Sequence, residues 1–259
     1  MPTMMNKIKQ ELKEAKKDME EVVKEVKKEA KGYCPKENAK KAESIPQIGW
    51  QEALKEHATG DIIMHHGTGT NSRNMQKAMG CYYSHTAMLL RSPPKDILQL
   101  YKVEDCPSDT YVWEVTAQVK GTRIVPWLKW IAAETERNGD KYIYVWRHLT
   151  GISSQAQATI YTEVRNLESL EYEKSQMQMI KALVHANDND DMSSAFCSEG
   201  VAHIYKKAGL LPSAVITSNQ TTADFSHYYS NADLGDQLQQ GSLAPEVRVN
   251  VKNIQWPPA

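Results

Sequence analysis

The sequence predicts an α+β domain with one sizeable core and a charged appendage. Apolar runs typical of strands lie at residues 59–64, 82–91 and 111–117, and apolar residues recur with helical spacing at 154–170 and 193–209. The chain has 259 residues, of which 41% are hydrophobic and 24% are charged, and its net charge is −1. This composition is typical of a soluble globular protein with one main domain.

Composition also argues against several classes of protein. A net charge of −1 indicates no nucleic-acid-binding surface. No apolar run approaches the length of a membrane span and the N-terminus lacks an apolar signal core, so we expect a cytoplasmic protein without stable membrane insertion. The cysteines, at positions 34, 81, 106 and 197, lack ligand-like spacing, which favours a reducing compartment over a zinc site or a disulfide framework.

Residues 1–45 are predicted to form a charged amphipathic helix followed by a linker. Between about residues 6 and 31, weak apolar residues recur at three- and four-residue steps among mixed lysines and glutamates. This pattern is compatible with a solvated helix on the domain surface or with self-association through residues 7–31. Prolines and lysines at 33–46 are typical of a linker.

The first strand, at 59–64, follows a short predicted helix at 50–57 and leads into His65 and His66. Adjacent residues on a strand point to opposite faces, so the two histidines cannot easily share one metal ion. We therefore expect loop or surface roles for both.

A histidine and a glutamate mark the next two strands. His85 stands at the mouth of the strand at 82–91, and Glu114 lies in the middle of the strand at 111–117, between Trp113 and Val115. A carboxylate among apolar residues is costly without a partner, and His85 is that partner if the two strands are neighbours. The alternatives are a hydrogen-bonded histidine at a strand edge and a glutamate on a solvent-facing side.

The remaining elements follow from the same patterns. We expect a strand at 97–103, a strand turning into a helix at 121–130, a strand at 141–148, helices at 154–170 and 175–185, a strand at 212–218 and a last strand at 247–251. The acidic run at 187–191 lacks the glycine and the distal glutamate of a calcium loop, so it is interpreted as a solvated linker.

The segment 193–209 is predicted to be a short helix with a cysteine in its first turn. Ser193 and Ser194 can cap it, and Gly209 closes it. Free backbone N–H groups and the positive end of the helix dipole favour the thiolate of Cys197, which is the nucleophilic form. The alternative is a small buried hydrophobe. A nucleophilic role requires a base and a group that orients the base, supplied from elsewhere in the chain.

An ordered set of motifs resembles a known family. The motifs are Gly60-Asp61-Ile62-Ile63, Ser84-His85-Thr86-Ala87, Trp113-Glu114-Val115, Thr122-Arg123-Ile124-Val125-Pro126-Trp127, and Phe196-Cys197-Ser198-Glu199-Gly200-Val201-Ala202 through Leu211. Together they resemble the circularly permuted papain-like amidases of the NlpC superfamily, the YiiX-like group most closely and the lecithin:retinol acyltransferases more distantly. The resemblance spans roughly residues 50–226. It implies an antiparallel sheet packed against the cysteine-bearing helix, with a catalytic domain at 46–226 and a C-terminal extension at 227–259.

The same resemblance implies a chemistry. Cys197 would be the nucleophile, His85 the general base and Glu114 the residue that orients the imidazole, with no metal or organic cofactor. The implied activity is hydrolysis of an amide bond (peptide, isopeptide or N-acyl) through a thioester, on a peptide, an amino-acid amide or a lipid amide. A lipid acyltransferase or thioesterase on the same residues, and a catalytically inactive binding module, stay open. The chain departs from the family at Gly200, where a leucine or a similar residue is usual.

Overall fold

The computed structural model describes residues 35–139, 142–230, 232–252 and 254, with the backbone alone at 176 and 177. The helices in these residues are α2 Pro35–Ser44, α3 Trp50–Glu56, α4 Thr70–Met79, α5 Lys95–Leu100, α6 Trp127–Asn138, α7 Ser154–Asn166, α8 Gln176–Leu183 and α9 Cys197–Lys207, with 3₁₀ turns η2 Thr217–Asn219 and η3 Leu234–Gln237. The strands are β1 Gln47–Gly49, β2 Ile62–His65, β3 His85–Arg91, β4 Thr110–Thr116, β5 Gly121–Pro126, β6 Tyr144–Arg147, β7 Leu149–Thr150, β8 Glu171–Tyr172, β9 Ser194–Ala195, β10 Ser242–Leu243 and β11 Val247–Asn250. The N-terminal helix predicted at 7–31 lies outside the described residues.

One large sheet organises the molecule, as expected for an α+β fold. Its nine strands run in the order β1-β11-β6-β2-β3-β4-β5-β8-β9. Pairing is antiparallel from β11 through to β8, but β1 pairs parallel with β11 and β8 pairs parallel with β9. The sheet is therefore mixed at both edges, whereas a purely antiparallel sheet was expected.

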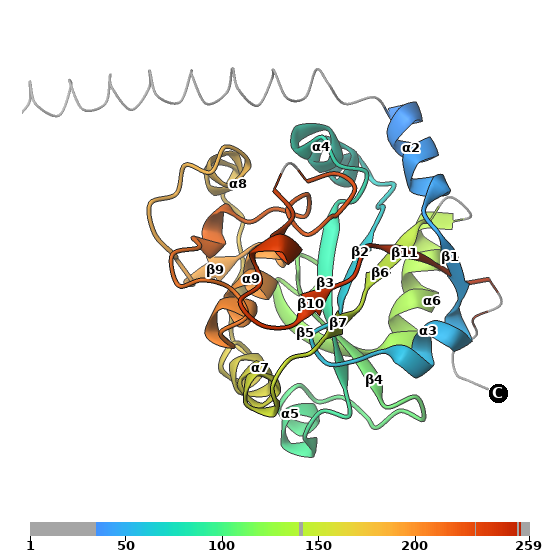
Figure 1. Ribbon diagram of the computed structural model, residues 1–259, viewed down its shortest axis with the longest axis vertical. Coiled ribbons are helices and arrows are strands. Elements are labelled where there is room, and N and C mark those ends of the chain that lie inside the picture. The colour runs from blue at the N-terminus through green and yellow to red at the C-terminus, as the bar shows by residue number, and fades with distance from the viewer. Residues whose placement is uncertain (1–34, 140–141, 231, 253, 255–259) are drawn as a thin grey trace, which may run out of the picture.

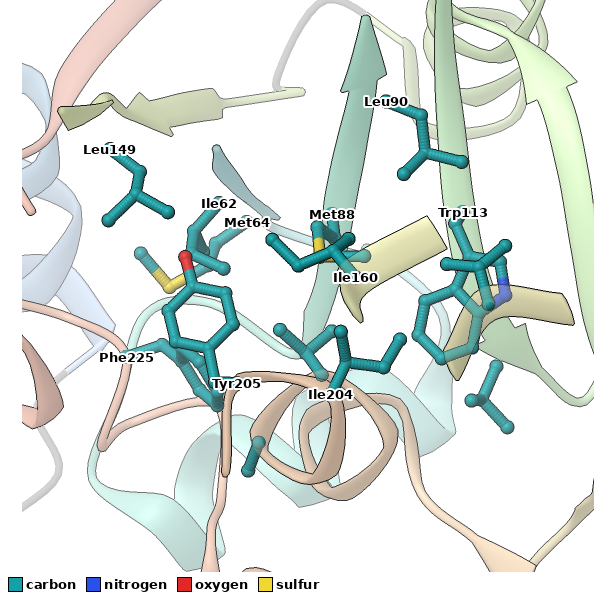
Figure 2. Close-up of a cluster of buried hydrophobic side chains, with 14 of the residues drawn as sticks. Ile62, Met64, Met88, Leu90, Trp113, Leu149, Ile160, Ile204, Tyr205 and Phe225 are labelled. Atoms are coloured by element: carbon teal, nitrogen blue, oxygen red, sulfur yellow. The ribbon is translucent and has the colours of Figure 1, made fainter. Parts of the chain in front are cut away.

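Helices cover both faces of this sheet (Figure 1). On one face α9 packs against β3 and β4, and α7 packs against α9. Figure 2 shows the core on this side, where Ile204 and Tyr205 of α9 meet Met88 and other apolar side chains of the strands. We call this side the α9 face.

The opposite side, which we call the α6 face, is covered by α6 and α3 (Figure 1). Side chains alternate along a strand, so Ile63 and Val112 point to the α6 face while Ile62 and Trp113 point to the α9 face. The core of the α6 face is rich in aromatic rings; it includes Trp127, Trp130, Tyr142, Tyr144 and Trp146.

Several local predictions were wrong. Residues 35–44, expected in a linker, form helix α2 with Ala42 fully buried. The strand expected at 97–103 is helix α5, which begins after Pro94 and buries the adjacent pair Ile97 and Leu98. Two adjacent apolar residues fit a strand that is buried on both faces, and they also fit the buried side of a helix. A pair this short therefore cannot distinguish the two.

The strand expected at 212–218 is absent from this part of the structure, and a 3₁₀ turn at Thr217–Asn219 takes its place. The carboxylate of Asp190 accepts hydrogen bonds from the backbone N–H of Thr217 (2.6 Å) and from its hydroxyl (2.9 Å). Side-chain bonds of this kind compete with strand pairing. Asp190 also pairs with Lys206 at 2.7 Å, so the acidic run at 187–191 is tied to the domain and is not a solvated linker.

Residues after 226, expected as a separate extension, belong to the same core. Strand β11 lies between β1 and β6 in the main sheet. The buried guanidinium of Arg147 pairs with Asp233 at 2.7 Å and donates to the carbonyl oxygens of Phe225, Leu243 and Ala244. In the part of the chain that the structure describes, no helix has the length and apolar character needed to cross a bilayer.

Candidate active site

Cys197 is the first residue of α9, and a glutamate holds this helix end in place. The Oε2 atom of Glu199 accepts a hydrogen bond from the backbone N–H of Phe196 (3.2 Å), and the Ser218 hydroxyl donates to Oε1. Burial raises the pKa of Glu199 to about 7. The capping predicted for the serines was wrong, because Ser194 donates its hydroxyl to Glu173 instead (2.8 Å).

Gly200 lets α9 approach the sheet closely. A Cβ atom at this position would lie 2.6 Å from Cγ2 of Val115 and 3.1 Å from Cη2 of Trp113, closer than side chains normally pack. The helix therefore needs glycine where it crosses β4. Position 200, where the family that the motifs resemble usually has a leucine or a similar residue, therefore has a packing reason to be glycine.

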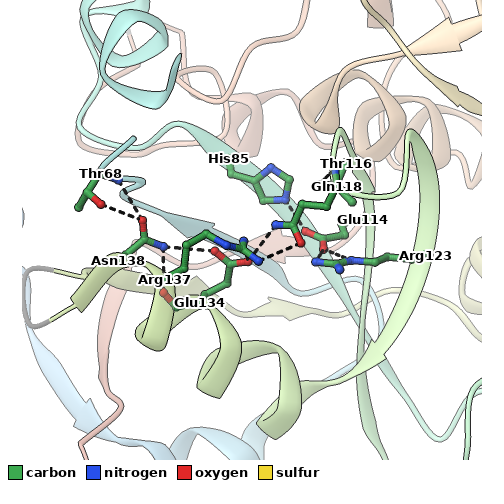
Figure 3. A network of polar contacts seen from close by, with 9 residues as sticks. All are labelled: Thr68, His85, Glu114, Thr116, Gln118, Arg123, Glu134, Arg137 and Asn138. Atoms are coloured by element: carbon green, nitrogen blue, oxygen red, sulfur yellow. Dashed lines mark hydrogen bonds and ion pairs between the residues drawn. The ribbon is translucent and has the colours of Figure 1, made fainter. Parts of the chain in front are cut away.

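The carboxylate of Glu114 is buried between a histidine and an arginine (Figure 3). His85 Nε2 lies 2.5 Å from Glu114 Oε2, and Arg123 Nε donates to Oε1 at 2.6 Å. Arg123 faces Glu114 directly across the β4–β5 pair. Although burial favours the neutral acid, the attraction of His85 and Arg123 lowers the pKa of Glu114 to about 2.

Sequence reasoning gave Arg123 no role, although it lies within one of the motifs. The register of two consecutive strands would have predicted this contact, because Arg123 lies opposite Glu114 only when Trp113 pairs with Ile124. A shift of one residue would send the guanidinium to the other face of the sheet.

His85 and Cys197 line the same cavity, and each shifts the pKa of the other. Burial opposes charge on both groups, but the mutual attraction outweighs it and lowers the pKa of the Cys197 thiol. The backbone N–H groups of Thr86 and Ser198 act in the same direction. The pKa of His85 is raised well above its ordinary value, against burial, by Cys197 and Glu114. The pair therefore favours thiolate and imidazolium.

The three side chains reach one another from the two faces of the sheet. Cys197 comes from α9, whereas Glu114 shares the α6 face with Val112. His85 is the first residue of β3, at the end of the strand, where its ring meets groups from both sides. The structure thus brings together all three residues singled out in the sequence.

A small cavity of about 70 Å³, lined by both apolar and polar side chains, lies over the sulfur. Its apolar part consists of Met75 and Met79 of α4, Met179, Ala182 and Leu183 of α8, Tyr172 and Phe196, and its polar part consists of Ser84, Ser198, Gln220, Thr221 and Thr222. Cys197 is only 9% exposed beneath this cover. Among the side chains that the structure describes, the ionisable ones that line the cavity are His85, Cys197 and Tyr172.

The other two described cysteines lie in different surroundings. Cys81 and Cys106 are buried and free, and burial raises the pKa of Cys81. Only Cys197 among these three has a histidine beside it that favours the thiolate. Cys34 lies outside the described residues.

Of the two histidines at the end of β2, His66 lies in the loop after the strand, as expected, whereas His65 is a buried strand residue. His65 is 8% exposed on β2, and His66 is half-buried with its ring stacked on Tyr82 at a centroid distance of 4.1 Å. Within the described ranges, no three His, Cys, Asp or Glu side chains are grouped so that they could hold a metal ion.

Comparisons with known proteins give a distant structural likeness. No family model matches the sequence, and no curated protein matches it. Among solved structures, a similar chain is YiiX from Escherichia coli O157:H7 (DUF1105), which is described as a metalloprotein. The match has a TM-score of 0.42 and 19% sequence identity, and it covers 78% of this chain and 99% of that chain.

Proposed function

We propose that this protein is a cytoplasmic cysteine hydrolase with a permuted papain-like arrangement, and that it cleaves an amide bond through a Cys197-His85-Glu114 triad. One observation carries the proposal: a thiol whose pKa is lowered lies against an imidazole that is itself paired with a buried carboxylate. Lowered thiol pKa values combined with a specific charge partner are characteristic of catalytic sites.

The chemistry follows from the three roles. His85 takes the thiol proton, and the Cys197 sulfur attacks the amide carbonyl to form a tetrahedral oxyanion. The backbone N–H of Cys197 is one donor for that oxyanion. The imidazolium then protonates the leaving amine, and water, deprotonated by His85, hydrolyses the thioester. Glu114 orients the imidazole and stabilises its charge, and Arg123 keeps Glu114 ionised.

The test is the rate at which iodoacetamide alkylates each cysteine between about pH 5 and pH 8, followed by peptide mass spectrometry. The proposal expects Cys197 to react faster than Cys81 and Cys106, and expects His85→Gln to abolish this advantage below pH 7. Cys197→Ala serves as the blank. If Cys197 is inert at neutral pH in the folded protein, the chain is a binding module and not an enzyme.

The apolar cover over Cys197 favours a second candidate, a thioesterase or acyltransferase that acts on a lipid. The three methionines that line the cavity are flexible and suit an irregular apolar group. Incubation with a lipid ester and with a peptide amide distinguishes the two candidates by the mass added to Cys197. A lipid acyl adduct supports the second candidate, and a peptidyl adduct supports the first.

A further inference from the structure

His65 lies directly behind the proposed general base. It pairs with His85 across the β2–β3 register, and the two ring centroids are 5.0 Å apart. Adjacent strands place paired residues on the same face, so His65 lies on the α6 face, where Trp130 and Tyr142 pack against it. The ring centroids of these two residues are 5.4 Å and 5.5 Å from that of His65.

Each of these three rings carries a buried polar atom with no hydrogen-bond partner among the described residues. The atoms are Nδ1 of His65, Nε1 of Trp130 and the hydroxyl oxygen of Tyr142. More than nine in ten buried polar groups in proteins have a partner, so three orphaned atoms, on His65 and on the two rings that pack against it, require an explanation.

The number of orphaned atoms matches the hydrogen bonds that one water molecule makes in a protein interior. A buried water makes about three hydrogen bonds to groups that are otherwise unpaired. The indole N–H of Trp130 can only donate, the Tyr142 hydroxyl can donate or accept, and an imidazole nitrogen can accept. A water that accepts from Trp130 and donates to His65 Nδ1 leaves the Tyr142 hydroxyl as its third partner.

His57 is a second buried histidine with unpaired ring nitrogens, but its neighbouring rings carry no unpaired polar atoms. Both of its ring nitrogens are buried and unpartnered among the described residues, and it packs between Trp127 and Trp146. The indole N–H groups of both tryptophans are already bonded, to Tyr144 and to Asp61. His57 therefore has no neighbouring orphaned donor with which to share a water.

We propose that His65, Trp130 and Tyr142 enclose a site for one buried water molecule, and that this hydrated cluster makes His65 a positioning residue for His85. The water fixes the tautomer and the orientation of the His65 ring. That ring packs against His85, whose other contacts are Glu114 and Cys197. The charged and titratable groups close enough to shift the pKa of His65 are His85, Glu114, His66 and Arg137, and Tyr142 packs against its ring. The positioning role rests on the proposed function, whereas the water site does not.

The experiment compares two substitutions of nearly equal size at each histidine of the full-length chain. Asn keeps a polar atom close to the place of Nδ1, and Leu removes it. We expect His65→Asn to have a higher melting temperature than His65→Leu, and His57→Asn to have a lower one than His57→Leu. Where the polar atom of the histidine has no partner, Leu is the more stabilising substitution. Where a water bridges that atom, Asn is the more stabilising one. Should His65→Leu fail to fold, Tyr142→Phe replaces it, and a melting temperature below that of the wild type is expected.

The second readout is the pH profile of Cys197 alkylation, which a purely structural role would not move. In His65→Leu, or in Tyr142→Phe, we expect the midpoint of thiolate formation to rise by about half a pH unit or more, a roughly threefold slower reaction on the acid side. His57→Leu keeps the wild-type midpoint. An unchanged profile in His65→Leu overturns the positioning role, and a melting temperature for His65→Leu at or above that of His65→Asn overturns the water site. If wild-type Cys197 does not react, the proposed function fails, and the order of melting temperatures still decides the water site.

Discussion

The two faces of the sheet differ in how completely their buried polar atoms are paired. On the α9 face, Gly200 lets the helix lie directly on Val115 and Trp113. On the α6 face, large aromatic rings form the core. Of the eight buried side-chain atoms without a partner among the described residues, six belong to His57, His65, Trp130, Thr135 and Tyr142, which are on or beside α6 and its core. The α9 face is closely packed, and the α6 face has aromatic packing with unpaired polar atoms. Glu114 and His85 lie where the two faces adjoin.

Two histidines, His57, which is buried, and His85, whose side chain is 16% exposed, show what this difference means for charge. Burial between two tryptophans lowers the pKa of His57 to about 3, so this ring is neutral. His85 is also in the interior, yet the attraction of Cys197 and Glu114 overcomes the effect of burial and raises its pKa. The comparison teaches that charged partners, and not depth alone, decide which histidine can take part in proton transfer.

Removing the carboxylate from His85 has the largest expected effect. Glu114→Ala leaves an imidazolium and the Arg123 guanidinium without their buried partner, so we expect the free energy of unfolding to fall by about 3–5 kcal/mol. Alkylation of Cys197 near pH 6 slows at least about tenfold because the thiol pKa rises by about one unit or more. Denaturant unfolding and the alkylation rate measure the two effects.

Glu134→Ala is the matched control for this change. Glu134 is a buried carboxylate of α6 that binds Arg137 and Asn138 and makes no hydrogen bond to His85. It is expected to lower stability without slowing alkylation. An alkylation rate in Glu114→Ala equal to that of the wild type contradicts the role assigned to the carboxylate.

Acid unfolding tests the neutral histidine. The folded pKa of His57 is about 3 and its ordinary value is 6.5, so between these values the unfolded chain binds one more proton than the folded chain. Stability is therefore complete above about pH 6.5 and falls as the pH decreases toward 3. His57 accounts for a loss of roughly 3 kcal/mol between pH 7 and pH 4.

Urea unfolding of the wild type and of His57→Leu across this pH range isolates the contribution, because the other titrating groups are common to both proteins. We expect the variant to lose less stability than the wild type as the pH falls. Parallel pH profiles would show that His57 is not buried as a neutral ring.

The close approach on the α9 face gives the smallest of the three effects. A methyl group at position 200 pushes α9 away from Val115 and Trp113, so Gly200→Ala is expected to lower the free energy of unfolding by about 1–3 kcal/mol. Gly69→Ala is the control, because no atom lies within 4 Å of a Cβ there; the substitution changes the N-cap of α4 and is expected to cost no more than about 1 kcal/mol. Equal unfolding midpoints for both variants would mean that α9 does not need glycine at this crossing.

Helices and strands with a long apolar repeat were predicted correctly. Segments with only a short apolar run, or with no repeat, were not. Strands β3 and β4 and helices α7 and α9 fall where the apolar periodicity placed them. The predicted strand at 97–103 failed because two adjacent apolar residues fit either period, and the one at 212–218 failed because Asp190, distant in sequence, bonds to Thr217. The linker at 33–46 and the boundary at 226 failed because contacts across the chain, not composition, include α2 and β11 in the domain.

For the candidate site, the sequence by itself determined which side chains were capable of the chemistry: a cysteine at a helix start, a histidine at a strand mouth and a glutamate among apolar neighbours. Only the tertiary structure decided that these three meet, that Arg123 and His65 lie beside them, and that His57 and His65 are neutral while His85 is poised to hold a proton. The physical reason is that strand register and helix approach are set by contacts between distant segments, and a pKa depends on the charges and the burial that those contacts create.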